Sequence, residues 1–461
     1  MSESTVAVEQ KPVRWLPVGI ALVAAVSLYC FAPLEQTLRA GLAIFLVAGI
    51  LWLTEAIHLS FTALLIPLLA VLTDVMPVRQ AFADFANPII FLFLGGFALA
   101  SALARHGIDR SIGAAVLSVA GTHPVRAIYL LFAATAFLSM WISNTATAAM
   151  MLPVALGIAS RFEDPQHRTH LFLLLGTAYS ASIGGIATLV GSPPNAIAAS
   201  HQNLSFQQWM QFGLPVTLIL MPLMVVLLQY LLKPSLTLKP MEQPIASIVA
   251  ASAATSPRQR KLTLTIFALV VLGWIFSSPL GAILGISKDL DAWIAITGIV
   301  LLGTCGVISW RDVEEKTNWG ILLLFGGGMT LSSILDTTGT SAFIANHLKL
   351  ALEHAPTLIA LLIITAFVVF LTEMVSNTAS AALLIPLLVP VASYFGVPAH
   401  IIAVLVAIAA SCAFMLPVAT PPNAIVFGSG LVPQRIMMRC GFYLNLLCIF
   451  LLTVLSFIKS A

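Results

Sequence analysis

Apolar residues in this chain gather in long blocks separated by short polar segments, from residue 15 almost to the end. Eleven blocks approach the roughly 20 residues that a helix needs to cross a bilayer, and two others are longer and interrupted. The pattern predicts an all-α polytopic membrane protein with about 11 transmembrane helices plus two re-entrant helical hairpins. The blocks cover residues 15–33, 40–57, 59–77, 87–105, 125–160, 170–200, 206–232, 261–281, 289–309, 319–338, 357–393, 399–429 and 436–458.

Residues 125–160 and 357–393 each carry a Ser-Asn-Thr tripeptide near the centre. A straight helix of about 36 residues would extend roughly 54 Å, far beyond the ~30 Å hydrocarbon core of a bilayer. Backbone that leaves the helix at membrane depth must lie against other protein or a water-filled cavity. Each of these two blocks is therefore predicted to be a re-entrant hairpin with its polar tip at membrane depth.

The two interruptions belong to a longer duplication. The string ISNTATAAMMLPVA at 142–155 recurs as VSNTASAALLIPLL at 375–388, and each copy is followed by a second shared string. That string reads TLVGSPPNAIA at 188–198 and LPVATPPNAIV at 416–426. Two polar, helix-breaking elements that occur twice in one order are typical of transporters whose binding site lies between two structural repeats.

The basic residues indicate how the repeats are oriented. With a cytoplasmic N-terminus and re-entrant hairpins, sixteen Lys and Arg residues fall on the cytoplasmic side and five outside. An odd number of crossings separates the hairpins, so the first enters from the cytoplasm and the second from outside. The chain is therefore predicted to form two inverted-topology repeats in a bacterial-type inner (plasma) membrane, with its C-terminus outside.

Composition narrows the class of protein. Hydrophobic residues make up 59% of the 461 positions and charged residues only 8%, against roughly 25% charged residues in soluble domains. Lipid must be the main solvent, and a net charge of +3 without a basic tract gives no sign of nucleic-acid binding. The cysteines have no spacing typical of a metal site. No nucleotide motif or catalytic triad occurs, so the chain is not expected to be an enzyme.

The hairpin tips carry the candidate chemistry. Asn144, Thr145, Asn377 and Thr378 offer amide and hydroxyl groups where one half-helix ends and another begins. The helix that begins has free N–H groups and a positive dipole end that attract an anion, whereas the one that ends has free carbonyls that suit a hard cation. One tip could thus bind both a carboxylate and a sodium ion. The plainer alternative is that each tripeptide is only an N-cap, and the duplication favours function.

The Pro-Pro-Asn strings mark a second pair of breaks. Two consecutive prolines remove two N–H donors and stop a helix, so residues 191–192 and 419–420 are expected to have extended backbone with exposed carbonyls. Asn195 and Asn423 are expected to cap the half-helices that follow. A simple proline kink is the alternative.

Glu55 and Glu373 are the acids placed in or beside apolar segments, where an acidic residue is a functional candidate. We expect a supporting role for Glu373, which lies three residues before the second Ser-Asn-Thr. No Lys or Arg lies near either tip, so a dianion bound there would need cations to compensate its charge, which predicts sodium coupling. In the rival interpretation, a proton-coupled exchanger would use Glu373 as its proton carrier.

These strings, with GSPPNAIA after the first tip and LPVATPPNAIVFGSG after the second, resemble the divalent anion/sodium symporter family of INDY-type carboxylate transporters. The resemblance covers nearly the whole chain and is greatest to bacterial sodium-dependent dicarboxylate transporters. It implies a homodimer whose protomers have a scaffold part and a mobile transport part and work by an elevator movement. The implied parts are scaffold 1–120, transport 121–232, a cytoplasmic linker 233–260, scaffold 261–354 and transport 355–461.

The resemblance also implies the ligands, with no organic cofactor. One sodium site would lie near the first tip, at Ser139, Ser143, Asn144 and Gly191. The other would lie near the second tip and use backbone carbonyls largely, at Thr372, Val375, Asn377 and Ala419. Substrate carboxylates would meet Asn144, Thr145, Asn377, Thr378, Thr420, Pro421 and Ser192.

The expected function is a sodium-coupled symporter that imports C4-dicarboxylates such as succinate, malate or fumarate. A sodium- or proton-coupled carrier of citrate or sulfate and a dicarboxylate exchanger stay open, because amide and hydroxyl donors do not determine the length of the anion. An anion channel is a remote alternative, since the sequence has no rings of charged residues to line a pore.

Overall fold

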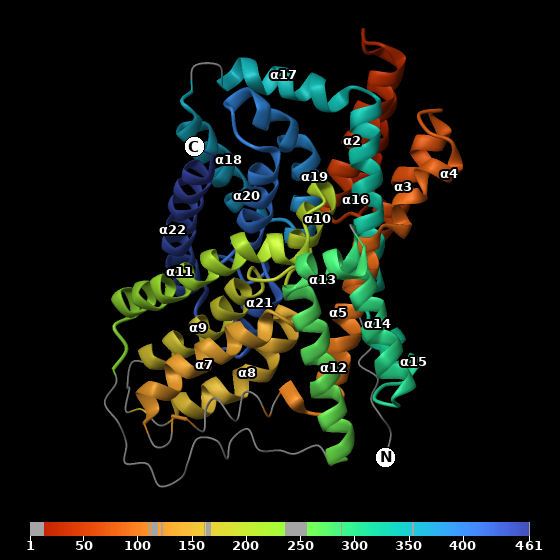
Figure 1. Cartoon of the computed structure of the whole chain (residues 1–461). Helices are drawn as coiled ribbons and strands as arrows, with labels where there is room; N and C mark the ends of the chain where they lie inside the picture. Colours follow the sequence, from red (N-terminus) through yellow and green to blue (C-terminus); the bar gives the residue numbers. More distant parts are fainter. Residues whose placement is uncertain are drawn as a thin grey trace.

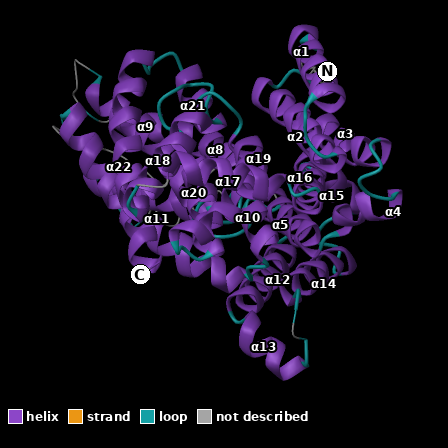
Figure 2. Cartoon of the chain, turned by 90° about the horizontal axis from the view of Figure 1, so that it is seen from above, coloured by secondary structure: helices purple, strands orange, loops and turns teal. Residues whose placement is uncertain are grey.

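The computed structural model describes residues 13–109, 111, 119–120, 123–160, 162, 167–235, 256–286, 288–352 and 355–460. Within these residues the regular elements are all helices, so the predicted all-α fold is confirmed (Figures 1 and 2). Most of the cytoplasmic linker expected at 233–260 lies outside the described residues. The helices are α1 (Trp15–Phe31), α2 (Gln36–Thr54), α3 (Leu59–Leu72), α4 (Val78–Ala81), η1 (Ala83–Ala86), α5 (Pro88–Arg105), α7 (Pro124–Ser139), α8 (Asn144–Ala159), α9 (Arg168–Gly184), α10 (Pro193–Gln202), α11 (Phe206–Leu232), α12 (Pro257–Ile275), α13 (Ser277–Leu284), α14 (Leu290–Thr304), α15 (Trp310–Lys316), α16 (Trp319–Thr337), α17 (Thr340–Leu352), α18 (Thr357–Thr372), α19 (Asn377–Leu388), η3 (Val389–Phe395), α20 (Ala399–Ser411), α21 (Pro421–Gly428) and α22 (Gln434–Ser460).

Length and hydropathy identify the helices that could cross a membrane, and shorter apolar helices occur both in the hairpins and elsewhere. In the described part of the chain, six stretches are long and apolar enough to cross a membrane, one of them the arm Asn377–Phe395 of the second hairpin, and α12 with α13 gives a seventh if the bent pair is one span. The expected number of about 11 crossings therefore stays a prediction. The hairpin arms α7 and α8 have 16 residues each. At 1.5 Å per residue each arm extends about 24 Å, less than the ~30 Å of a hydrocarbon core. The two arms also pack against each other, as the arms of a hairpin do.

The predicted end of the span at residues 261–281 is wrong. Helix α12 stops at Ile275, and α13 leaves at an angle of 85°. Pro279 in the first turn of α13 has no N–H to donate to the carbonyl of Ile275, so α12 cannot continue. Pro390 has the same effect on the second hairpin, where α19 gives way to the short 3-10 helix η3.

The helices form two groups that meet along α10, α16 and α19. In Figure 2, α1, α2, α3, α12 and α14 lie on one side and α8, α9, α18, α20, α21 and α22 on the other. Two helices are central to the second group: α9 packs on α7, α8 and α11, and α20 packs on α10, α18, α19 and α22. Residues 171–184 and 401–411 are buried throughout. A helix that is apolar all round is expected in such a position, because it has no face to turn to solvent.

Glycines bring helices close in two matching glycine-rich strings, FLGGFALASAL at 93–103 in α5 and FGGGMTLSSIL at 325–335 in α16. A Cβ on Gly95 would lie 2.6 Å from the Cβ of Ala295, and a Cβ on Gly327 would lie 2.6 Å from the Cα of Ala63. The next glycine in each string, Gly96 or Gly328, faces the second group of helices. These strings therefore serve close helix packing, as small residues do in membrane proteins.

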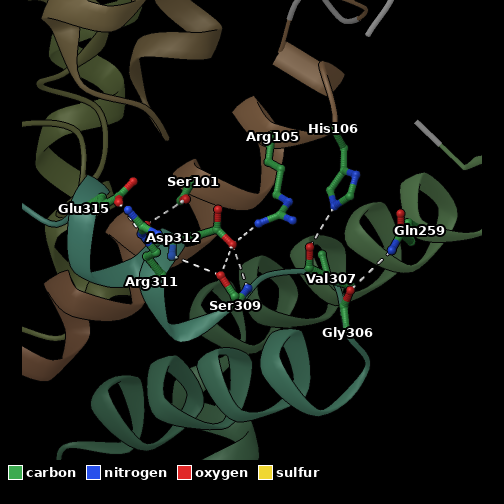
Figure 3. Close-up of polar contacts among 10 residues, drawn as sticks. All are labelled: Ser101, Arg105, His106, Gln259, Gly306, Val307, Ser309, Arg311, Asp312 and Glu315. Carbon is green, nitrogen blue, oxygen red and sulfur yellow. Dashed lines mark hydrogen bonds and ion pairs between the residues drawn. The ribbon is translucent and has the colours of Figure 1, made fainter. Parts of the chain in front are cut away.

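A polar cluster joins the end of α5 to the corner between α14 and α15 (Figure 3). Arg105 forms an ion pair with Asp312, whose carboxylate also accepts hydrogen bonds from the N–H (2.7 Å) and hydroxyl (2.6 Å) of Ser309. The His106 ring contacts the carbonyl of Val307 at 3.0 Å. Partial burial raises the pKa of the Asp312 carboxyl, but the Ser309 bonds and Arg105 outweigh it, so the pKa lies below its usual range. The carboxylate stays ionised at neutral pH and holds the corner on α5.

The close packing of α16 on α3 predicts a position-dependent effect of adding one methyl group. Gly327→Ala should destabilise the protein by about 1–3 kcal/mol, because the new Cβ meets backbone atoms of Ala63 that cannot move aside. Gly303→Ala, on α14, is the matched control. Nothing lies within 4 Å of its added Cβ, so it should be neutral or stabilising by up to about 1 kcal/mol. Thermal unfolding of both variants in detergent measures the difference, and equal midpoints would contradict this packing.

Candidate substrate and cation site

The first hairpin tip is held against α9. Helix α7 ends at Ser139, and α8 begins at Asn144 with Ser143 as its N-cap, whose hydroxyl accepts the N–H of Ala146 at 3.3 Å. The Ser139 hydroxyl donates to the carbonyl of Ala181 at 2.6 Å. Because its single proton is used there, the hydroxyl accepts from the Asn144 amide, which lies 2.6 Å away.

The amide of Asn144 also reaches the second break of the same repeat. With its nitrogen toward Ser139, it lies 3.2 Å from the carbonyl of Ala181 and 3.3 Å from that of Gly191. Three acceptor oxygens on one side assign the nitrogen to that side, which leaves the side-chain oxygen of Asn144 facing away from them. Three of the residues expected at the first sodium site, Ser139, Asn144 and Gly191, are thus in contact.

The second tip brings the same groups together. The Thr372 hydroxyl at the end of α18 lies 2.8 Å from the carbonyl of Ala410 and 2.7 Å from the side-chain oxygen of Asn377, the first residue of α19. Thr372 therefore takes the place of Ser139, Asn377 that of Asn144, and Ala410 that of Ala181. Ser139 and Thr372 are both fully buried.

The Pro-Pro-Asn strings form breaks between α9 and α10 and between α20 and α21. Ser192 has φ −147° and ψ 137°, and Thr420 has φ −139° and ψ 147°, so the expected extended backbone is confirmed at these two residues. Gly191 and Ala419, for which it was also expected, lie in turns. The prolines start α10 and α21, where a missing N–H costs nothing because the first turn has no intrahelical acceptor for it.

The expected capping role of Asn195 and Asn423 is wrong. The side-chain nitrogen of Asn195 donates backwards across the break, to the carbonyls of Gly185 (2.8 Å) and Thr188 (2.7 Å). Asn423 does the same for the carbonyls of Ala413 (3.3 Å) and Leu416 (3.1 Å). The hydroxyl of Thr420 accepts the N–H of Asn423 and is the cap of α21. Each asparagine therefore closes its break because carbonyls freed from the helix need donors.

The two repeats are interleaved at these breaks. Helix α10 of the first repeat packs on α19 and α20 of the second, and α21 of the second packs on α8 and α9 of the first. The hydroxyls of Ser192 and Ser411 are 3.4 Å apart at the point where the breaks meet. Contacts therefore link the N-termini of α8, α10 and α19 in one region.

The site offers neutral oxygen and nitrogen donors together with helix ends. Among the described residues, His, Cys, Asp and Glu form no cluster that could hold a metal ion. Ser143, Thr145 and Pro421 are exposed, Asn144, Asn377 and Thr378 are half-buried, and Ser192 and Thr420 are buried. A positive helix end with amides and hydroxyls can bind an anion, and hydroxyl and carbonyl oxygens suit a hard cation.

Side chains that the sequence analysis did not single out complete the second break. The Tyr179 hydroxyl donates to the carbonyl of Phe414 at 2.9 Å, and Asn445 on α22 donates to Glu373 at 2.7 Å. Glu373 is 3% exposed. A lone asparagine in the apolar block 436–458 was the available signal for Asn445, because a buried amide needs a partner.

A cleft of about 1000 Å³ opens elsewhere, between the start of α5, the α10–α11 connection, α13 and the start of α14. Polar residues of these segments line it, including Asn87, Gln208 and Asp291, and it contains none of the expected ligands. The candidate site is therefore defined by the hairpin tips and the breaks.

Comparison with known proteins assigns the chain. It matches the citrate transporter family, CitMHS, over residues 49–409. The chain belongs to this family. It is 46% identical over 433 residues to an uncharacterized transporter of Haemophilus influenzae, covering 92% of each chain. It is 33% identical over 442 residues to the sodium-dependent dicarboxylate transporter SdcS of Staphylococcus saprophyticus, covering 90% of this chain and 85% of that protein.

Two solved structures share the fold at low sequence identity. The YdaH transporter of Alcanivorax borkumensis has a TM-score of 0.55 and 14% identity, over 95% of this chain and 96% of its own. MtrF of Neisseria gonorrhoeae, described as one of a class of antimetabolite efflux pumps, has a TM-score of 0.60 and 13% identity, over 95% and 97%. The family expected from the sequence is confirmed. The protein is a multi-pass membrane protein and a secondary transporter of carboxylates, not an enzyme.

Asn195 clasps the first break, in that its side-chain nitrogen donates to two carbonyls across the break. This clasp yields a prediction on stability. Asn195→Ala should destabilise the protein by about 2–4 kcal/mol, because two buried carbonyls, those of Gly185 and Thr188, lose their donor. Asn423→Ala should cost less, since its two bonds are longer. Thermal unfolding in detergent compares them, with Thr304→Ala as control. The exposed Thr304 hydroxyl bonds only carbonyls of its own helix, so a shift there as large as that of Asn195→Ala would refute the clasp.

Proposed function

We propose that this protein is a sodium-coupled symporter that imports C4-dicarboxylates such as succinate, malate and fumarate. The observation that carries the proposal is the pair of matching tips, each with an amide at the start of a helix, linked through the breaks by the Ser192–Ser411 contact. A short molecule with a carboxylate at each end suits two such groups. The sodium-dependent dicarboxylate transporter named among the relatives supports this substrate class and this ion.

In this proposal the substrate carboxylates meet the tip and break residues at helix ends. The contributing residues are Asn144, Thr145, Asn377, Thr378, Thr420, Pro421 and Ser192. One sodium ion binds at Ser139, Ser143, Asn144 and Gly191, and another at Thr372, Val375, Asn377 and Ala419. Asn144 lies against Ser139 and Gly191 at the first tip, and Asn377 lies 2.7 Å from Thr372 at the second, so each set brings its polar groups together. On binding sodium at the first tip, the oxygens that the Asn144 NH₂ group contacts would turn to the ion. Two cations balance a dianion that neutral groups alone would leave poorly compensated.

The transport movement is proposed to be of the elevator type, in a homodimer with a cytoplasmic N-terminus. Residues 121–232 and 355–461 form the mobile part, and residues 1–120 and 261–354 form the scaffold. The small residues where the groups meet support a sliding boundary: Gly96 faces Val190, and Gly328 faces Ala382. A smooth boundary lets packed helices shift without large changes in side-chain conformation.

The proton-coupled rival rests on Glu373 as a proton carrier. Each group around this carboxylate is a donor: the N–H groups of Phe414, Met415 and Leu416 and the amide of Asn445. A protonated carboxyl would turn one of its oxygens into a donor that faces another donor. This arrangement argues against Glu373 as a proton carrier.

Uptake into proteoliposomes tests the ion and the substrate. Labelled succinate should accumulate with an inward sodium gradient, and replacement of sodium by choline should reduce the rate by at least tenfold. Unlabelled succinate, malate and fumarate should compete. Uptake that persists in choline would reject sodium coupling, and block by citrate or sulfate without block by succinate would reject the C4 substrate.

The tips are tested by single substitutions. Asn144→Ala and Asn377→Ala should each reduce succinate uptake at least tenfold. Each removes a side-chain amide that is proposed to bind both a substrate carboxylate and a sodium ion. Thr304→Ala on α14 is the matched control and should keep the wild-type rate. Detergent chromatography checks that each variant is folded. Wild-type uptake by both asparagine variants would remove the tips from the mechanism.

A further inference from the structure

Glu373 holds the backbone of the second break. Its carboxylate accepts hydrogen bonds from three consecutive backbone N–H groups, those of Phe414 (2.7 Å), Met415 (2.9 Å) and Leu416 (3.0 Å). Asn445 on α22 provides a fourth donor at 2.7 Å. In a continuous helix these N–H groups would bond the carbonyls four residues earlier, and the break after Ser411 removes those partners. Successive free N–H groups form a concavity for an anion, and Glu373 fills it from within the chain.

The carboxylate is connected to the proposed cation and substrate ligands through Leu416. The N–H of Leu416 donates to Glu373, while its carbonyl accepts the N–H of Ala419 and the side-chain amide of Asn423, each at 3.1 Å. Ala419 is proposed to bind the second sodium ion, and Thr420 follows it as the cap of α21. Glu373 thereby sets the position of the backbone that leads to Ala419 and Thr420. Its carboxylate is not itself proposed to contact the sodium ion or the substrate.

The first repeat makes the same connection with the partners exchanged. Met140 occupies the place of Glu373, directly after Ser139 and before the tip. Thr188 occupies the place of Leu416, seven residues before the clasping asparagine in each break. The Thr188 hydroxyl donates to the carbonyl of Met140 at 2.5 Å. In the first repeat, a side chain of the break thus bonds the backbone of the tip. In the second, a side chain of the tip bonds the backbone of the break.

We propose that Glu373 is a positioning residue that keeps the second break in its ligand-binding conformation before sodium arrives. The inference rests on the proposed function for the identity of the cation, but the backbone it concerns is defined independently of it. Thr188 has the same role in the first break by means of a neutral hydrogen bond. The second cation site therefore depends on one charged side chain that does not coordinate the ion.

Hydrogen exchange of the wild-type protein tests the preformed conformation. The experiment compares peptides that contain Phe414, Met415 and Leu416 in sodium-free buffer and in saturating sodium. The expected result is strong protection in both, because the acceptor belongs to the protein and is present without the ion. Free exchange without sodium, with protection only when sodium is added, would overturn the proposal. This readout holds whatever substrate the protein carries and needs no variant to fold.

Uptake by Glu373→Gln gives the functional test. Glutamine has one acceptor oxygen, and its NH₂ group would face donors, so the break should loosen. The half-saturating sodium concentration should rise at least tenfold, while high sodium should restore the maximal rate and the KM for succinate at saturating sodium should stay within threefold. Sodium rescue distinguishes positioning from misfolding.

The matched comparison is Thr188→Val, which should raise the sodium requirement less, because it removes one neutral bond. A wild-type sodium requirement in Glu373→Gln would reject the positioning role. If wild-type protein itself took up succinate without sodium, the proposed function would fail, and the exchange experiment would still decide the role of Glu373.

Discussion

A broken helix deep in a membrane must find partners for the peptide groups that a continuous helix would have paired. This constraint shapes the centre of the protein. Asn195 and Asn423 supply donors to the freed carbonyls, and Tyr179 supplies another to Phe414. Trp209 donates its ring N–H to the carbonyl of Ile186 at 3.0 Å in the first break. With these partners the breaks can be fixed features of the fold, and fixed breaks keep helix ends and carbonyls available to a ligand.

Packing provides the frame around the breaks. The central helices α9 and α20 are buried on all sides, so the ends from which the breaks extend have little freedom to move. Each repeat also covers the break of the other, since α10 packs on α19 and α21 packs on α8. Neither repeat alone encloses its own break, which is why a binding site at the interface requires both halves of the chain.

The two halves keep one geometry with different chemistry. The tip hydroxyl, the tip amide and the carbonyl of the neighbouring helix recur in both repeats at closely similar distances. The connection from tip to break differs: Thr188 bonds Met140 in one repeat, and Glu373 bonds Leu416 in the other. The second half gains a buried negative charge that the first lacks. The halves of a symmetric fold can therefore differ electrostatically while their backbones remain equivalent.

The sequence by itself determined the all-helical membrane class, the two interruptions at the Ser-Asn-Thr strings and the extended residue directly before each proline pair. These depend on hydropathy, on helix length against bilayer thickness and on the missing N–H of proline, all of which are local properties. Only the tertiary structure decided which groups Asn195, Glu373 and Asn445 bond, and that Arg105 pairs with Asp312. Leu416, which bonds Glu373, lies 43 residues from it in the sequence, and Asp312 lies 207 residues from Arg105. A buried polar side chain must bond some partner, but its own sequence does not say which one, because the choice depends on which distant backbone groups the packing leaves unpaired.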